Sequence, residues 1–178
     1  WIDSAIGYGV VATELIPCGT ITWTLCDFDR NLTFVAEEVN TMDEDYKAIV
    51  EKYAYIDSAG KYVLCWDLGR YMNHSCLPNS LPVDDFNEIA VRDILPGEEL
   101  TCDYSFLNYQ TAMPCLCGED SCRQEIKPRY YLYFQGSGKR LVEAALTYFD
   151  KVEQPLYKFV KEKELLLSIK DNPTLIKW

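Results

Sequence analysis

Three cysteines in the second half of the chain have the spacing of metal ligands. Cys115, Cys117 and Cys122 form a Cys-x-Cys-x4-Cys cluster within 109–123, a stretch without helical or strand periodicity. A structural zinc site takes four ligands, and a short loop can point three thiolates at one centre. Because a stretch of this kind has no core of its own, a metal would order it. The cluster therefore predicts a zinc site whose fourth ligand comes from elsewhere.

The stretch 70–79 offers two candidates for that fourth ligand. It holds the only histidine of the 178-residue chain, His74, and two residues later Cys76 in an irregular Ser-Cys-Leu-Pro segment. Four further cysteines are weaker candidates: Cys18, Cys26, Cys65 and Cys102. The last two lie inside strand patterns, where cysteine is often a small buried hydrophobe. Spacing favours Cys76 and leaves His74 as the competing ligand.

The eight cysteines could instead form four disulfides, as in a small secreted scaffold. Their spacing is uneven, however, and a composition of 48% hydrophobic residues is enough for one core. We therefore expect free thiols and a reducing, intracellular compartment, either nucleus or cytoplasm. The sequence has no apolar run of about 18 residues, so it predicts no membrane span. It also has no amino-terminal charged segment followed by an apolar one, so it predicts no signal peptide. The first residue is Trp1 rather than Met, so the sequence leaves open what precedes it.

The net charge of -11 is unevenly distributed. Residues 1–126 contain 7 Lys and Arg against 22 Asp and Glu, whereas 127–178 contain 10 against 6. An acidic surface repels a phosphate backbone and attracts cations, which disfavours direct nucleic-acid binding and favours a basic polypeptide partner. The simpler interpretation is a solvated acidic face that maintains solubility.

Short strands must position these residues. Residues 8–25 are predicted to form two strands separated by a turn at 17–19, and residues 55–66 two strands separated by a turn at 57–60. Two further strands are predicted at 88–94 and 99–104. The 88–94 segment alternates as a half-buried strand, and Pro96-Gly97 marks a turn after it. Gly7-Tyr8-Gly9 precedes the first strand, where two glycines would allow a close approach of the backbone to a ligand.

Three helices complete the predicted elements. A capping box at 41–44 and apolar residues at helical spacing predict a helix over 42–53. Two more are predicted over 139–152 and 156–169, with Pro155 between them. We expect this basic tail to pack on the domain, with partner binding as the alternative.

Four blocks in this order resemble the motifs of a SET domain, the fold of protein lysine methyltransferases, and of its post-SET segment. They are Gly-Tyr-Gly-Val-Val-Ala at 7–12, Arg-Tyr-Met-Asn-His-Ser-Cys-Leu-Pro-Asn at 70–79, Glu-Glu-Leu-Thr-Cys-Asp-Tyr at 98–104 and Cys-Leu-Cys-Gly-x3-Cys-Arg at 115–123. The resemblance implies a β-rich α+β fold in which 73–74 threads through a loop as a pseudoknot, which ordinary topology rules would not predict. It also implies a SET domain over 1–108, a zinc-bound post-SET loop over 109–127 and a helical C-terminal extension over 128–178.

The resemblance also implies the roles of individual residues. The implied zinc ligands are Cys76, Cys115, Cys117 and Cys122. The residues implied to bind S-adenosylmethionine are Gly7, Tyr8, Gly9, Arg70, Asn73, His74, Tyr104 and Leu116. Tyr104 is implied to be catalytic, since a tyrosine hydroxyl can orient an amine without adding a formal charge. Asp103 is a further acceptor that could fix the local backbone.

The implied reaction is methyl transfer from S-adenosylmethionine to the ε-amine of a lysine in a protein, with histone tails as the leading substrate class. The rival is a non-catalytic SET and zinc module that acts as a protein-interaction scaffold. A redox thiol protein is less favoured, because no Cys-x-x-Cys follows a strand into a helix. Cys102 occupies a position where many members carry Phe or Tyr, so the number of methyl groups added stays open.

Overall fold

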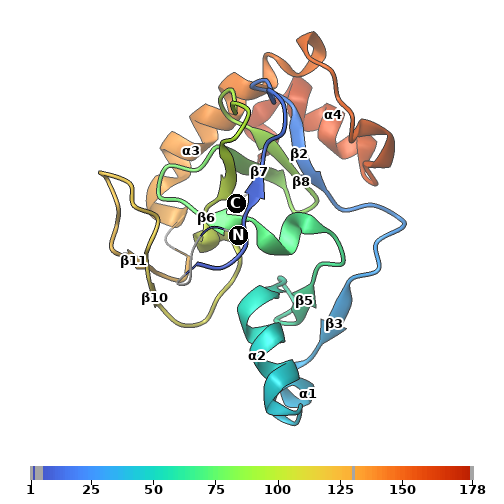
Figure 1. Cartoon of the computed structure of the whole chain (residues 1–178). Coiled ribbons are helices and arrows are strands. Elements are labelled where there is room, and N and C mark those ends of the chain that lie inside the picture. The colour runs from blue at the N-terminus through green and yellow to red at the C-terminus, as the bar shows by residue number, and fades with distance from the viewer. Residues whose placement is uncertain (1, 3–5, 130, 177–178) are drawn as a thin grey trace.

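The computed structural model describes residues 2, 6–129 and 131–176, and its strands form four small sheets (Figure 1). The strands are β1 (Val10–Val11), β2 (Ile21–Thr24), β3 (Leu32–Phe34), β4 (Tyr55–Ile56), β5 (Tyr62–Leu64), β6 (Asn73–His74), β7 (Ser80–Asp84), β8 (Asn87–Ala90), β9 (Glu99–Cys102), β10 (Met113–Pro114) and β11 (Glu125–Ile126). The helices are α1 (Ala36–Asn40), α2 (Glu44–Tyr53), α3 (Tyr131–Leu146) and α4 (Lys163–Asp171). This is the strand-rich α+β architecture that the sequence predicts. No helix in the described ranges is both long and apolar enough to cross a bilayer.

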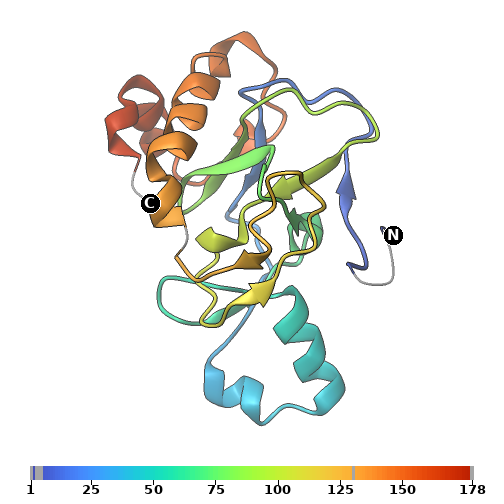
Figure 2. The ribbon, with the colours of Figure 1, turned by 90° about the vertical axis from the view of Figure 1, so that its left-hand side faces the viewer.

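The largest core lies between the antiparallel sheet β2-β8-β7 and the carboxy-terminal helices. Helices α3 and α4 cover one face of this sheet, as Figures 1 and 2 show. The buried residues that join the two layers include Ile21, Leu81, Val83 and Ile89 from the strands and Val142, Ala145, Leu166 and Ile169 from the helices. The prediction that the helical tail packs on the domain is therefore confirmed.

A second sheet, β1-β9-β6, brings the motif segments together. Strand β1 runs antiparallel to β9, with Val10 opposite Leu100. Strand β6 runs parallel to β9 on the other side, with His74 opposite Cys102. Parallel neighbours need a long connection, and here β7 and β8 lie in the chain between them. The sheet thus places 73–74 and the turn before Val10 on opposite sides of β9, while the predicted threading stays a prediction.

The third sheet, β3-β5-β4, contains the predicted hairpin. Strands β4 and β5 pair antiparallel, and the Asp57 carboxylate accepts hydrogen bonds from the backbone N–H groups of Ala59 and Lys61, both at 2.9 Å. An aspartate that binds its own turn in this way fixes the loop, so the hairpin prediction is confirmed. Strand β3 pairs with the other edge of β5 and was not predicted.

The helix predicted over 42–53 begins two residues later than expected. Asp43 is its N-cap, since its carboxylate accepts from the Asp45 N–H at 3.1 Å. The Thr41 hydroxyl instead donates to the Glu38 carbonyl at 3.0 Å and closes the short helix α1. The predicted capping box was wrong because the threonine belongs to the end of one helix, whereas the aspartate begins the next.

Other boundaries also differ from the prediction. Strand β8 ends at Ala90 rather than at 94, and β9 ends at Cys102 because Asp103 caps a 3₁₀ turn, Tyr104–Phe106. In the tail, α3 starts at residue 131 and ends at 146, and α4 starts only at 163, after a 3₁₀ turn. The strand β7 contains Pro82 and β10 contains Pro114, which removes the sequence signal for a strand.

Candidate functional site

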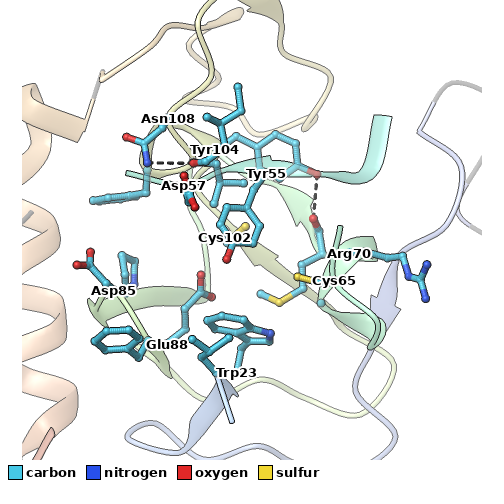
Figure 3. Close-up of a pocket in the computed structure, with 18 of the residues that line it drawn as sticks. Trp23, Tyr55, Asp57, Cys65, Arg70, Asp85, Glu88, Cys102, Tyr104 and Asn108 are labelled. Carbon is cyan, nitrogen blue, oxygen red and sulfur yellow. Dashed lines mark hydrogen bonds between the residues drawn. The ribbon is translucent and has the colours of Figure 1, made fainter. Parts of the chain in front are cut away.

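Tyr104 lines a cavity of about 600 Å³ (Figure 3). It stands at the start of the 3₁₀ turn after β9, and its hydroxyl donates to the Met72 carbonyl oxygen at 2.8 Å. Burial raises the pKa of the phenol well above its ordinary value. The hydroxyl therefore stays neutral at physiological pH and can still accept a hydrogen bond from a group in the cavity. We call this cavity the tyrosine pocket; its walls include Trp23, Tyr55, Cys65, Cys102 and Tyr109.

Asn73 links the amino-terminal glycines to β9. Its side-chain amide donates to the Tyr8 carbonyl at 2.9 Å and to Glu99 Oε1 at 2.6 Å. A Cβ on Gly9 would lie 2.8 Å from Ile2 Cγ1, so a larger residue there would displace the neighbouring side chains. Gly7 adopts a φ of 95°, which side chains other than glycine rarely tolerate. These contacts form a backbone cradle at Gly7, Tyr8 and Gly9, and fit the close approach expected for a cofactor.

A cation that the sequence analysis missed lies beside this cradle. A Cβ on Gly7 would stand 3.3 Å from Lys52 Nζ, which comes from helix α2. Tyr8 and Tyr71 extend the same surface with ring centroids 5.7 Å apart. No sequence pattern links residue 52 to residue 7, since only the packing of α2 makes them neighbours.

The His74 imidazole is held by groups of the protein on both sides. Its Nδ1 accepts a hydrogen bond from the Tyr104 backbone N–H at 3.2 Å, and the Arg123 guanidinium lies 3.2 Å from its Nε2. Nε2 lies 3.3 Å from Cys76 Sγ. Burial is the main cause that lowers the pKa of His74 to about 4. The neutral ring therefore connects the backbone of the catalytic candidate to the cysteine cluster.

A buried ion pair lies directly against this histidine. Arg123 forms a bidentate pair with Asp103, with Nη1 2.9 Å from Oδ2 and Nη2 2.8 Å from Oδ1. Arg123 Nε also donates to Cys76 Sγ at 3.2 Å. The two paired side chains are only 9% and 8% exposed. The sequence analysis placed Asp103 as a backbone acceptor, which its bond from the Ser105 N–H at 3.0 Å confirms, but did not find its arginine partner.

The cysteine cluster has the geometry of a metal centre. The ligand atoms of His74, Cys76, Cys115 and Cys117 all lie within 4.8 Å of one another. The Cys122 thiol interacts with those of Cys115 and Cys117, and its Sγ accepts from the Gln124 N–H at 3.3 Å. Three thiols with either a fourth thiol or an imidazole are the donor set that zinc prefers, so these residues fit zinc.

The electrostatics of the cluster suit thiolate formation at Cys117. Burial raises the pKa of Cys76 and of Cys115. Burial also acts to raise that of Cys117, but backbone hydrogen bonds and the neighbouring thiols outweigh it and lower the pKa to about 7. The pairing of β10 with β11 holds the loop, because the Cys115 N–H donates to the Gln124 carbonyl at 3.0 Å. Cys65, directly after β5, and Cys102, in β9, are both buried, as predicted.

Two residues predicted to bind the cofactor, Arg70 and Leu116, have no contact in the described part of the chain that shows such a role. The Arg70 guanidinium donates to the Trp66 carbonyl at 2.9 Å and points away from the tyrosine pocket in Figure 3. Leu116 sits between two cysteines of the cluster and is 60% exposed, so it presents an uncovered apolar surface. Their roles in cofactor binding stay predictions.

Comparison with known proteins gives a match to the SET domain family over residues 7–105. A Schizosaccharomyces pombe histone-lysine N-methyltransferase, H3 lysine-4 specific, is 32% identical over 102 residues, which are 53% of this chain and 10% of that protein. A Cryptococcus neoformans histone-lysine N-methyltransferase, H3 lysine-36 specific, is 31% identical over 132 residues, covering 65% of this chain and 15% of that protein. The chain thus spans a small part of these relatives. The solved methyltransferase domain of human SETMAR shares 25% identity, with a TM-score of 0.46 over 67% of this chain and 54% of that one.

Proposed function

The chain belongs to the SET-domain family, and from this premise we propose that it transfers a methyl group from S-adenosylmethionine to the ε-amine of a lysine in a protein. Such a transfer needs a neutral amine, an in-line arrangement of the reacting atoms and a site that excludes water. The tyrosine pocket supports an ordered arrangement of the reacting atoms, because its wall holds a hydroxyl in a fixed position.

The observation that carries the proposal is the fixed, neutral hydroxyl of Tyr104. Its proton is directed to the Met72 carbonyl, so its lone pairs are available to a hydrogen-bond donor such as an amine. The raised pKa argues against tyrosinate as a base and for a positioning and electrostatic role. His74 fixes the backbone of the same residue through its bond to the Tyr104 N–H.

The cofactor site is proposed at the cradle of Gly7, Tyr8 and Gly9. When bound, S-adenosylmethionine supplies an activated methyl group and the positive charge of its sulfonium. Asn73 holds the Tyr8 carbonyl in place, and Lys52 offers a cation for the cofactor's carboxylate. Leu116 would cover an apolar part of the ligand.

A structural zinc bound by Cys76, Cys115, Cys117 and Cys122 would hold the loop that carries Leu116. His74 competes with Cys122 for the fourth position, since its imidazole lies within the same cluster. Because the cluster contacts Arg123 and His74, which reach Asp103 and Tyr104, loss of metal would disturb the catalytic candidate as well as the loop.

Histone tails are the proposed substrate class. The two relatives described above are named for methylation of lysines in histone H3, and the acidic half of this chain suits a basic tail. A histone methyltransferase of this kind would act in the nucleus. The target lysine and the number of methyl groups are left to experiment.

A labelling assay tests the proposal. Purified, zinc-loaded protein is incubated with methyl-labelled S-adenosylmethionine and a panel of histones, and cofactor binding is measured separately by calorimetry. We expect label on lysine in at least one histone and a binding isotherm for the cofactor. Cofactor binding without transfer to any basic protein would favour the scaffold alternative, and absence of both would reject the methyltransferase proposal.

A further inference from the structure

We propose that Glu88 is a specificity-determining residue that binds the cationic head of a lysine side chain as it enters the tyrosine pocket, before the amine loses the proton that would block methyl transfer. The inference rests on the proposed function and deepens it, since it names the group that selects a charged side chain. Glu88 belongs to none of the motifs by which the chain resembles its family, and it lies in the strand β8.

The position of Glu88 follows from the register of the sheet. Strand β8 is central, with Trp23 of β2 and Pro82 of β7 directly opposite Glu88. The next residue, Ile89, points into the core under α3 and α4, and neighbouring residues of a strand face opposite sides. Glu88 therefore lies on the uncovered face of the sheet, and this face forms a wall of the tyrosine pocket.

The carboxylate has an acceptor oxygen to spare. Oε2 accepts a hydrogen bond from the Ser80 hydroxyl at 2.7 Å. Among the described residues, Oε1 has no hydrogen-bond partner, and no lysine or arginine forms an ion pair with Glu88. Figure 3 shows the carboxylate directed toward the middle of the pocket, below Cys102 and beside Trp23. A carboxylate placed in a pocket without a cation is costly, so a ligand that brings the cation would be bound there.

The surroundings suit an alkylammonium group. Trp23 supplies an aromatic ring next to the carboxylate, and aromatic rings and carboxylates both attract ammonium groups. Cys102 is a small side chain at the wall between Glu88 and Tyr104 in Figure 3, and the Glu88 charge acts on its thiol. A long side chain that enters the pocket could therefore meet the Tyr104 hydroxyl and the Glu88 carboxylate in one cavity.

Two other acids of the pocket, Asp57 and Asp84, are half-buried like Glu88, but each accepts hydrogen bonds from N–H groups of its own turn. Asp85 also lines the pocket but is exposed to solvent, whereas Glu88 is partly buried and burial raises its pKa. Charges screened by water contribute less to binding than charges inside a cavity. The selection of a cation should therefore depend on Glu88 much more than on Asp85.

The test compares two small probes with the same four-carbon chain, one with a cationic and one with a neutral polar head. Binding of n-butylammonium, a mimic of the lysine side chain, and of neutral n-butanol is measured by ligand-observed NMR with the zinc-loaded chain. We expect the wild-type protein to bind butylammonium about tenfold more tightly than butanol, as for one charge-assisted hydrogen bond. Glu88→Gln, which keeps an oxygen for Ser80, should reduce this ratio to within about twofold of unity. Asp85→Asn should leave it within about twofold of the wild-type value.

Each outcome decides the proposal. An unchanged ratio in Glu88→Gln, an equal loss in Asp85→Asn, or no binding of butylammonium to wild-type protein would overturn it. Thermal unfolding shows whether Glu88→Gln is folded, so a loss of structure cannot imitate the expected result. Binding of the probes requires no methyl transfer. If the protein methylates nothing but shows the expected binding ratios, the proposed function is rejected and the role of Glu88 still stands. Where transfer occurs, Glu88→Gln should raise KM for the protein substrate about tenfold and leave cofactor affinity unchanged.

Discussion

The buried pair of Asp103 and Arg123 should be the ionic contact on which stability depends most strongly. Arg123→Ala removes the guanidinium and leaves the Asp103 carboxylate, only 8% exposed, without its bidentate partner. It also removes a donor to Cys76 Sγ. The substitution therefore acts on the turn that begins at Tyr104 and on the cysteine cluster together.

The expected magnitude follows from burial. Removing one partner of a buried ion pair costs about 3–5 kcal/mol, because the remaining charge stays desolvated. For a chain of this length each kcal/mol lowers Tm by about 2–4 °C, so a decrease of about 6–20 °C is expected. Arg92 offers a matched control, since it pairs with Glu98 but is 46% exposed. Arg92→Ala should cost at most about 1 kcal/mol.

Urea unfolding of the zinc-loaded proteins measures both values, with zinc content determined for each sample. Asp103→Asn and the double variant Asp103→Asn/Arg123→Ala complete a cycle, in which the double variant should be more stable than the sum of the single effects predicts. If Arg123→Ala lowers the free energy of unfolding by no more than Arg92→Ala does, at equal zinc content, the reasoning is refuted. So would strict additivity in the cycle.

Three further results are expected. Tyr104→Phe should lower the methylation rate by about 10²-fold or more with cofactor affinity retained. Tyr46→Phe removes an exposed hydroxyl and should leave the methylation rate unchanged. Equal rates for the two variants would remove the catalytic assignment. Cys76→Ser should contain less zinc by elemental analysis and have a lower Tm than the wild-type protein. Cys26→Ser, outside the cluster, should keep about one zinc per chain. Retained zinc in Cys76→Ser would contradict the ligand assignment. Burial raises the folded-state pKa of Glu88, so its ionisation destabilises the fold as pH rises above the ordinary value of 4.5. Glu88→Gln should therefore have a higher Tm than wild type at neutral pH, with a difference that shrinks as pH falls toward 4.5, and a constant difference would argue against this account.

Short-range chemistry decided what could be predicted from the sequence. The cysteines of the 115–122 loop, the glycines of the cradle and Tyr104 lie in compact motifs, and the hairpin of β4 and β5 depends on an aspartate within its own turn. Each of these features is fixed by residues a few positions apart, so spacing and residue type carry the information.

Boundaries of elements were less predictable, because neighbouring elements compete for the same residues. Thr41 can cap a following helix or close a preceding one, and the formation of α1 decides between them. Prolines in β7 and β10 conceal strands that exist because a partner strand lies beside them.

Only the tertiary structure decided what surrounds each motif residue. Arg123 meets Asp103 across 20 positions, and Lys52 reaches Gly7 through the packing of α2. The alternation of 88–94 assigns Glu88 to the face away from the core, but it cannot show whether water or a pocket covers that face. The sequence by itself determined the family and predicted the residues that we propose carry its chemistry. The Glu88 carboxylate in the tyrosine pocket and the Asp103–Arg123 pair, which contacts both Cys76 and the turn at Tyr104, depend on contacts between distant segments. No local sequence pattern records these contacts.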